Sequence, residues 1–193
     1  RRILFATGVH DELPDIPGLA ERWGQSVFHC PYCHGYELDQ GRIGVIGASD
    51  MSAHQAELLT DWGDVTFLIN QTLTVDEADA QRLSDKGVVF EPTPIARIED
   101  KAKIVLTDGR TLSFAGLFVA SRVKPASALP HVMGCVLERT PIGYQLQTDR
   151  CKQTSVDGVY ACGDLARAPH SLSLAVGDGA LAGAMVHQSL VWA

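Results

Sequence analysis

Residues 42–69 read RIGVIGASDMSAHQAELLTDWGDVTFLI, and the hydrophobic pattern changes twice along this segment. The apolar run at 42–46 predicts a short strand, the helical spacing over 50–62 predicts a helix, and residues 65–69 predict a second strand. A strand, a helix and a strand within about thirty residues form a parallel pair with a right-handed crossover in nearly all known cases. The segment therefore predicts an α/β fold with a nucleotide-binding turn after the first strand.

The turn after the first strand matches a dinucleotide-binding fingerprint only in part. Such turns use glycines so that the backbone can approach a pyrophosphate at the N-terminus of a helix. The first glycine is present, but Ser49 occupies the second glycine position and Ser52 the third small-residue position. A purely structural turn could have the same sequence. The candidate cofactor-binding residues here are Gly47, Ala48, Ser49, Asp50 and Met51.

The end of the second strand normally carries the residue that distinguishes NAD from NADP. An acidic residue there binds the ribose hydroxyls, whereas an arginine accommodates the 2′-phosphate. This chain has Asn70 and Gln71 instead. The sequence therefore does not indicate which nicotinamide nucleotide would bind.

Upstream of this segment the chain reads CPYC from Cys30 to Cys33, with His29 and His34 on either side. Two thiols at this spacing can close a small disulfide loop on a turn or a first helical turn. A helix N-terminus or a nearby cation lowers a thiol pKa and makes such a pair reactive. The spacing therefore predicts reversible redox chemistry. The alternatives are half of a zinc site, which usually needs a second close pair, or two inert buried cysteines.

Apolar runs and turn residues predict the remaining elements. We expect strands at 3–6, 88–90, 116–120 and 159–161, helices at 73–86 and 171–192, and a β-meander at 95–114 with an Asp108-Gly109 turn. The hydrophobic pattern over residues 121–157 is too weak to predict helices or strands there. Prolines and a glycine at 13–18 indicate a domain boundary.

Composition narrows the classes of function. The net charge of −7, without a basic cluster, argues against a nucleic-acid partner. No apolar run is long enough to span a bilayer and no leader is recognisable, so we expect a cytoplasmic protein. Five cysteines, three of them isolated, argue against a secreted disulfide framework. The chain begins with Arg1 rather than Met, and we expect it to be a piece of a longer protein.

Four motifs in order resemble thioredoxin reductase and its relatives: ILFATG at 3–8, CPYCHGYE at 30–37, VIGASDMSA at 45–53 and GVYACGDLA at 158–166. The resemblance covers essentially the whole chain. It implies a Rossmann-like three-layer nucleotide-binding domain inserted into a FAD-binding domain. Residues 1–9 and 121–193 would belong to the FAD domain, and residues 10–120 would form the NAD(P)-binding domain. The family's FAD pyrophosphate segment lies earlier, so we expect an incomplete FAD domain and little activity from these residues alone.

The resemblance also implies roles for individual residues. Cys33 would face the flavin, Cys30 would attack the substrate disulfide, and His34 would be the catalytic acid, where the family usually has Asp. Without the family, Gly163-Asp164 is a turn and His170 a solvated loop residue. The implied FAD contacts are Thr7, Gly8, Gly163, Asp164, His170, Ser171 and Leu172.

Three functions remain open from the sequence. In a reductase, NADPH or NADH reduces FAD, and the cysteine pair passes the electrons to a thioredoxin-like protein or a small disulfide. In an oxidase, the pair accepts electrons from a small dithiol and oxygen accepts them finally. His34 after the second cysteine and the incomplete nucleotide turn resemble the dithiol oxidases of small natural products, and the lack of basic residues near Asn70 favours this direction. The third function is a non-catalytic nucleotide- or zinc-binding module. We expect a homodimer, as in the relatives, and no bound metal.

Overall fold

The structure is a computed structural model that describes residues 1–71 and 73–192, and the chain divides into two compact units. The middle unit is Leu13–Ser121, and the flanking unit combines Arg1–Glu12 with Arg122–Ala193. Residue 193, which the expected FAD segment includes, lies outside the described residues. The assignment of these units to NAD(P) and FAD stays a prediction.

The middle unit contains a five-stranded parallel sheet in its described residues. β4 has the bounds that the apolar run predicted, and it pairs in parallel with β5, from Arg42 opposite Asp64 to Ile46 opposite Leu68. The α/β fold class is therefore confirmed. The strands, in sheet order, are β3 (Val27–Phe28), β10 (Gly116–Val119), β4 (Arg42–Ile46), β5 (Asp64–Leu68) and β6 (Val89–Glu91).

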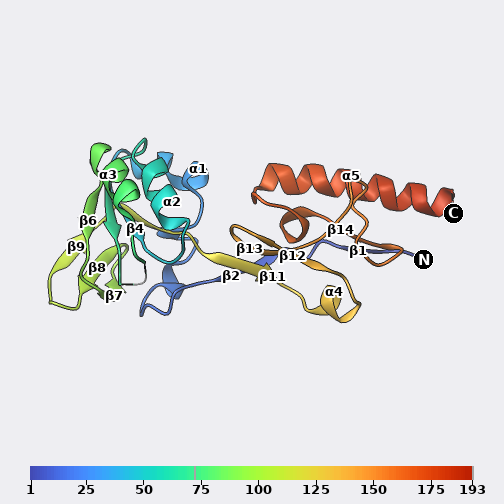
Figure 1. Cartoon of the computed structure of the whole chain (residues 1–193), viewed down its shortest axis with the longest axis horizontal. Coiled ribbons are helices and arrows are strands. Elements are labelled where there is room, and N and C mark those ends of the chain that lie inside the picture. The colour runs from blue at the N-terminus through green and yellow to red at the C-terminus, as the bar shows by residue number, and fades with distance from the viewer. Residues whose placement is uncertain (72, 193) are drawn as a thin grey trace. The chain divides into compact units, whose positions relative to one another are not determined.

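Two different layers cover the faces of this sheet (Figure 1). Alternate residues of a strand point to opposite faces. Ile43 and Val45 accordingly join the core beneath the helices, whereas Ile46 joins the core beneath the meander. The middle unit therefore has three layers. The helices are α2 (Ser52–Leu59) and α3 (Glu77–Asp85), and the meander is β7 (Ile95–Glu99), β8 (Lys103–Leu106) and β9 (Thr111–Ser113).

The helix expected at 73–86 begins later than predicted. Asp76 is its N-cap residue, and the Asp76 carboxylate accepts a hydrogen bond from the Asp79 backbone N–H at 2.7 Å. Leu73 and Val75 instead pack against the core as part of the preceding loop. The predicted start at residue 73 is wrong because two apolar loop residues extended the helical pattern.

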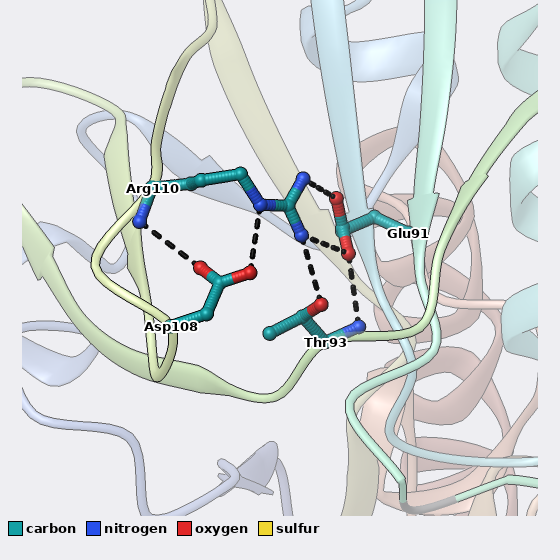
Figure 2. A network of polar contacts seen from close by, with 4 residues as sticks. All are labelled: Glu91, Thr93, Asp108 and Arg110. Carbon is teal, nitrogen blue, oxygen red and sulfur yellow. Dashed lines mark hydrogen bonds and ion pairs between the residues drawn. The ribbon is translucent and has the colours of Figure 1, made fainter.

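An ion-pair network joins β6 to the β8–β9 turn (Figure 2). The Arg110 guanidinium donates to both carboxylate oxygens of Glu91, at 2.7 and 3.0 Å, and to Asp108 at 2.7 Å. It also donates to the Thr93 hydroxyl at 2.9 Å. The hydrogen bonds from Arg110, more than any other contact, lower the pKa of Glu91 from its ordinary 4.5 to about 2. The network fixes the predicted Asp108-Gly109 turn to the edge of the parallel sheet.

The flanking unit combines the two ends of the chain. In its described part, β1 (Ile3–Phe5) pairs in parallel with β14 (Val159–Ala161), the strand predicted at these residues. Residues 121–157, where the sequence signal is weak, form the short helix α4 (Leu129–Val132) and most of a second sheet. The strand order of this sheet is β12 (Leu137–Thr140), β13 (Gly143–Leu146), β11 (Arg122–Pro125) and β2 (Val9–Glu12).

A long helix, α5 (Leu172–Val191), ends the described chain, close to the predicted bounds (Figure 1). Ser171 caps it by accepting a hydrogen bond from the Leu174 N–H at 3.2 Å. Asp178 is buried on this helix and binds Lys152 at 2.8 Å and Arg167 at 3.0 Å. A buried carboxylate needs such partners. The two ion pairs hold the chain at residues 152 and 167 beside α5.

Candidate redox site and nucleotide-binding segments

The two cysteines of the CPYC motif lie at the beginning of a short helix, α1 (Pro31–His34). Cys30 is its N-cap residue, and Pro31 takes the first helical position, where a missing N–H costs no hydrogen bond. The Cys33 N–H donates to the Cys30 carbonyl at 3.2 Å. Cys30 is half-buried, Cys33 is exposed, and both are free thiols. The motif therefore has the helical setting that its spacing predicted.

The two thiols interact in the reduced protein. A side-chain hydrogen bond with Cys30, followed by partial burial and by the charge of Cys30, raises the pKa of Cys33 from 9.0 to about 11. Cys33 therefore keeps its proton near neutral pH while the pair is reduced. Sulfur atoms in hydrogen-bond contact are also close enough to form a disulfide after small side-chain rotations.

His34 lies in the same small pocket as the thiols. The pocket has a volume of about 210 Å³, and its lining includes Trp23, Phe28, His29, Cys30, Cys33 and His34. The His34 ring stacks on Phe28, with centroids 4.2 Å apart and planes at 19°. Its Nδ1 atom lies 3.5 Å from the Glu37 carboxylate. The structure thus brings together the three residues predicted to be catalytic, against largely apolar walls.

Residues outside the motif hold this segment in place. Gln55 of α2 is buried and donates to the His29 carbonyl at 2.6 Å. Trp62 packs edge-on against Tyr32, with centroids 5.5 Å apart, and a Cβ atom at Gly35 would lie 2.8 Å from the Trp62 ring. Sequence reasoning missed Gln55, for which no local pattern exists. The His34–Glu37 spacing of three residues could have identified Glu37.

The five candidate residues of the nucleotide turn lie together between β4 and α2. Gly47 is required there because an added Cβ would lie 2.7 Å from the Ile69 carbonyl oxygen. Asp50 is exposed, and Met51 is the half-buried N-cap residue of α2. The first glycine of the fingerprint therefore permits close packing of the turn against the next strand.

The two serines of this turn are buried and form hydrogen bonds within the protein. The Ser52 hydroxyl accepts from the backbone N–H groups of Ala48 at 3.0 Å and of Ser49 at 3.1 Å. The Ser49 hydroxyl donates to the Ala120 carbonyl at 2.8 Å. Sequence reasoning noted Ser52 as a departure from the fingerprint but did not place it among the site residues.

The Asn70 side chain, where a ribose contact was considered, has a structural role. Its Oδ1 atom accepts a hydrogen bond from the Ile95 N–H at 2.8 Å and so fixes the start of β7. Asn70 has a positive φ of 54°, a conformation that asparagine tolerates better than most residues. The end of β5 therefore uses this side chain to hold the meander.

The candidate flavin contacts belong to the flanking unit. Thr7 and Gly8 follow β1, Gly163 and Asp164 open the short 3₁₀ helix η3 (Gly163–Ala166), and the others, His170, Ser171 and Leu172, lie at the start of α5. Gly163 has a φ of 69°, which favours glycine.

Asp164 provides the test of whether this segment fits FAD. Its Oδ1 atom is buried and has no hydrogen-bond partner among residues 1–71 and 73–192. Buried carboxylate oxygens normally have partners. A ligand hydroxyl, such as those of the ribityl chain of FAD, would supply one. The segment therefore fits the flavin that the resemblance implies.

The described residues contain no group of three or more His, Cys, Asp or Glu side chains arranged to hold a metal ion. No helix in the described part of the chain is long and apolar enough to cross a membrane.

The middle unit thus combines a parallel α/β sheet with a dithiol at the start of a short helix, as in the family that the sequence resembles. Residues 1–179 match the family described as pyridine nucleotide-disulphide oxidoreductase, and the chain belongs to this family. The predicted family is confirmed, and its relatives are of the thioredoxin-reductase type.

Two similar solved structures and one curated relative cover nearly the whole chain. Thioredoxin reductase sirT of Leptosphaeria maculans is 29% identical over 97% of this chain and 62% of its own length. An oxidoreductase from Agrobacterium tumefaciens is 49% identical with a TM-score of 0.94, over 99% of this chain and 65% of that protein. HlmI is 35% identical with a TM-score of 0.88, over 99% of this chain and 60% of HlmI. The chain thus spans less than two thirds of these proteins.

Proposed function

We propose that Cys30 and Cys33 form the redox pair of a flavin-dependent thiol–disulfide oxidoreductase. The observation that carries this proposal is the reduced, hydrogen-bonded dithiol at the start of α1, in one pocket with His34. Membership of the family supports it. Two inert buried cysteines would not be open to solvent, whereas Cys33 is exposed.

The geometry supports a definite exchange reaction. Cys30, the half-buried N-cap residue of α1, is the thiol that attacks, after it gives its proton to His34 in the same pocket. The Cys30 sulfur bonds to one sulfur of a substrate disulfide, and the other substrate sulfur leaves and takes a proton from His34. Cys33 then attacks the Cys30 sulfur, which closes the protein disulfide, and the second substrate sulfur leaves and takes the proton of Cys33. Two electrons and two protons pass to the substrate, and a dithiol substrate reverses every step.

FAD, when bound, carries the two electrons to or from the Cys30–Cys33 disulfide. Gly163 and Asp164 would hold its ribityl and phosphate portion, and the buried, unpartnered oxygen of Asp164 supports this. The further candidate contacts are Thr7, Gly8, His170, Ser171 and Leu172.

In the reductase direction, NADPH or NADH is the electron donor, and the acceptor is a thioredoxin-like protein or a small disulfide. The name of the sirT relative supports this direction. A homodimer in the cytoplasm belongs to the same proposal.

A second candidate is an oxidase that closes small dithiols and passes the electrons to oxygen. The observation that favours it is the engagement of Asn70 with β7, because this leaves the end of β5 without its usual contact to the ribose of a nicotinamide nucleotide.

Anaerobic visible spectra of the natural protein that contains these residues test the proposal. We expect dithiothreitol to bleach the flavin band through the cysteine pair, whichever direction is physiological. Bleaching by NADPH identifies the reductase, whereas bleaching by dithiol alone, with recovery in air, identifies the oxidase. A flavin band that neither reagent changes would contradict the proposed function.

A further inference from the structure

A dinucleotide turn works because it offers two things to a pyrophosphate. Its backbone N–H groups point toward the ligand, and its second glycine leaves room for the phosphates to approach the backbone. In this chain the Ser52 hydroxyl already accepts hydrogen bonds from the N–H groups of Ala48, at 3.0 Å, and of Ser49, at 3.1 Å. Two donors of the turn are therefore used within the protein.

The second position of the fingerprint is filled as well. Ser49 stands where the second glycine belongs, and its side chain is buried. Its hydroxyl donates to the carbonyl of Ala120, directly after β10, at 2.8 Å. The turn is thus tied both to its own helix and to the neighbouring strand. A side chain therefore occupies the position that the fingerprint leaves empty, and moving it would leave the Ala120 carbonyl without this bond.

We propose that Ser49 and Ser52 close the dinucleotide turn against the pyrophosphate of NADPH and NADH. The family's nicotinamide-binding turn is here a structural turn, and its residues do not fit the nucleotide. Resting on the proposed function of the Cys30–Cys33 pair, this inference selects the oxidase direction, in which a dithiol substrate supplies two electrons and oxygen accepts them.

The test compares nucleotide binding by the natural protein that contains these residues with binding by its S49G/S52A variant. Isothermal titration with NADPH and with NADH should give a Kd above about 1 mM for the wild type. The variant should bind at least about tenfold more tightly, because its N–H groups and the glycine position are open. Thr60→Ala is the matched control, since the Thr60 hydroxyl donates to the Glu57 backbone carbonyl at the other end of α2. It should bind as the wild type does.

Two results would overturn the inference. One is micromolar binding of either nucleotide by the wild type, which needs no variant and so holds even if S49G/S52A does not fold. The other is unchanged, weak binding by a variant whose circular dichroism matches the wild type. Reduction of the flavin by dithiothreitol does not involve this turn, so that measurement reports separately on the Cys30–Cys33 pair.

Discussion

Replacing Cys33 with serine should lower the exchange of electrons between flavin and a dithiol or disulfide on the order of 10³-fold or more, because the protein disulfide can no longer form. Cys30→Ser should have an effect of the same order. The two variants should differ in what accumulates. With Cys33 absent, Cys30 can still attack a substrate disulfide, and the mixed disulfide then persists because no second thiol resolves it.

Mass spectrometry of the intact protein after incubation with a small disulfide detects this adduct. We expect it on Cys30 in the Cys33→Ser variant. Cys151→Ser is the matched control, because Cys151 is also exposed but lies outside the motif. Turnover of Cys33→Ser close to that of the wild type would contradict the assignment, as would an equal loss in Cys151→Ser.

Replacing Glu91 with glutamine should lower the free energy of unfolding of the middle unit at pH 7 by about 2 kcal/mol. The Glu91 side chain is 10% exposed and binds Arg110 through two hydrogen bonds (Figure 2). The cost should be smaller than the full pKa shift implies, because Arg110 is 52% exposed and water screens the pair.

The same contact predicts a pH dependence. The pKa of Glu91 falls on folding, from 4.5 to about 2, so its contribution is complete above about pH 5 and is lost as the pH falls toward 2. Urea unfolding followed by circular dichroism gives the free energy of unfolding between pH 2 and 7. This free energy should rise less steeply with pH in Glu91→Gln than in the wild type. The control is Glu99→Gln, which removes a more exposed ion pair with Arg97 and should cost much less than Glu91→Gln. Equal effects in the two variants would count against the network.

The fold was predictable where buried strands and local turns determine it. β4 and β14 have the predicted bounds because apolar runs flanked by turn residues mark short buried strands. Residues 121–157 gave no such signal, since β11 depends on pairing with β2, more than a hundred residues earlier. Pairing over that separation leaves little trace in a local hydrophobic pattern.

The candidate site was predictable in part for a similar reason. The spacing of Cys30 and Cys33 and the histidine beside them were readable, because neighbours in sequence are neighbours on one helical turn. The hydrogen-bond partners of a serine hydroxyl could not be predicted from the sequence. In the sequence, Ser52 is a small departure from the fingerprint. In the structure, its hydroxyl accepts hydrogen bonds from two backbone N–H groups of the turn. Gln55 reaches His29 from a separate helix and leaves no sequence signature.

The central claim, that Cys30 and Cys33 are a reversible redox pair, is tested most directly by trapping thiols across a series of glutathione buffers. Alkylation followed by peptide mass spectrometry reports which cysteines are free at each redox potential. We predict that Cys30 and Cys33 convert together to a single intramolecular disulfide and return to thiols together, while buried Cys135 and Cys162 stay reduced. Independent alkylation of Cys30 and Cys33 at every potential, with no disulfide between them, would contradict the account.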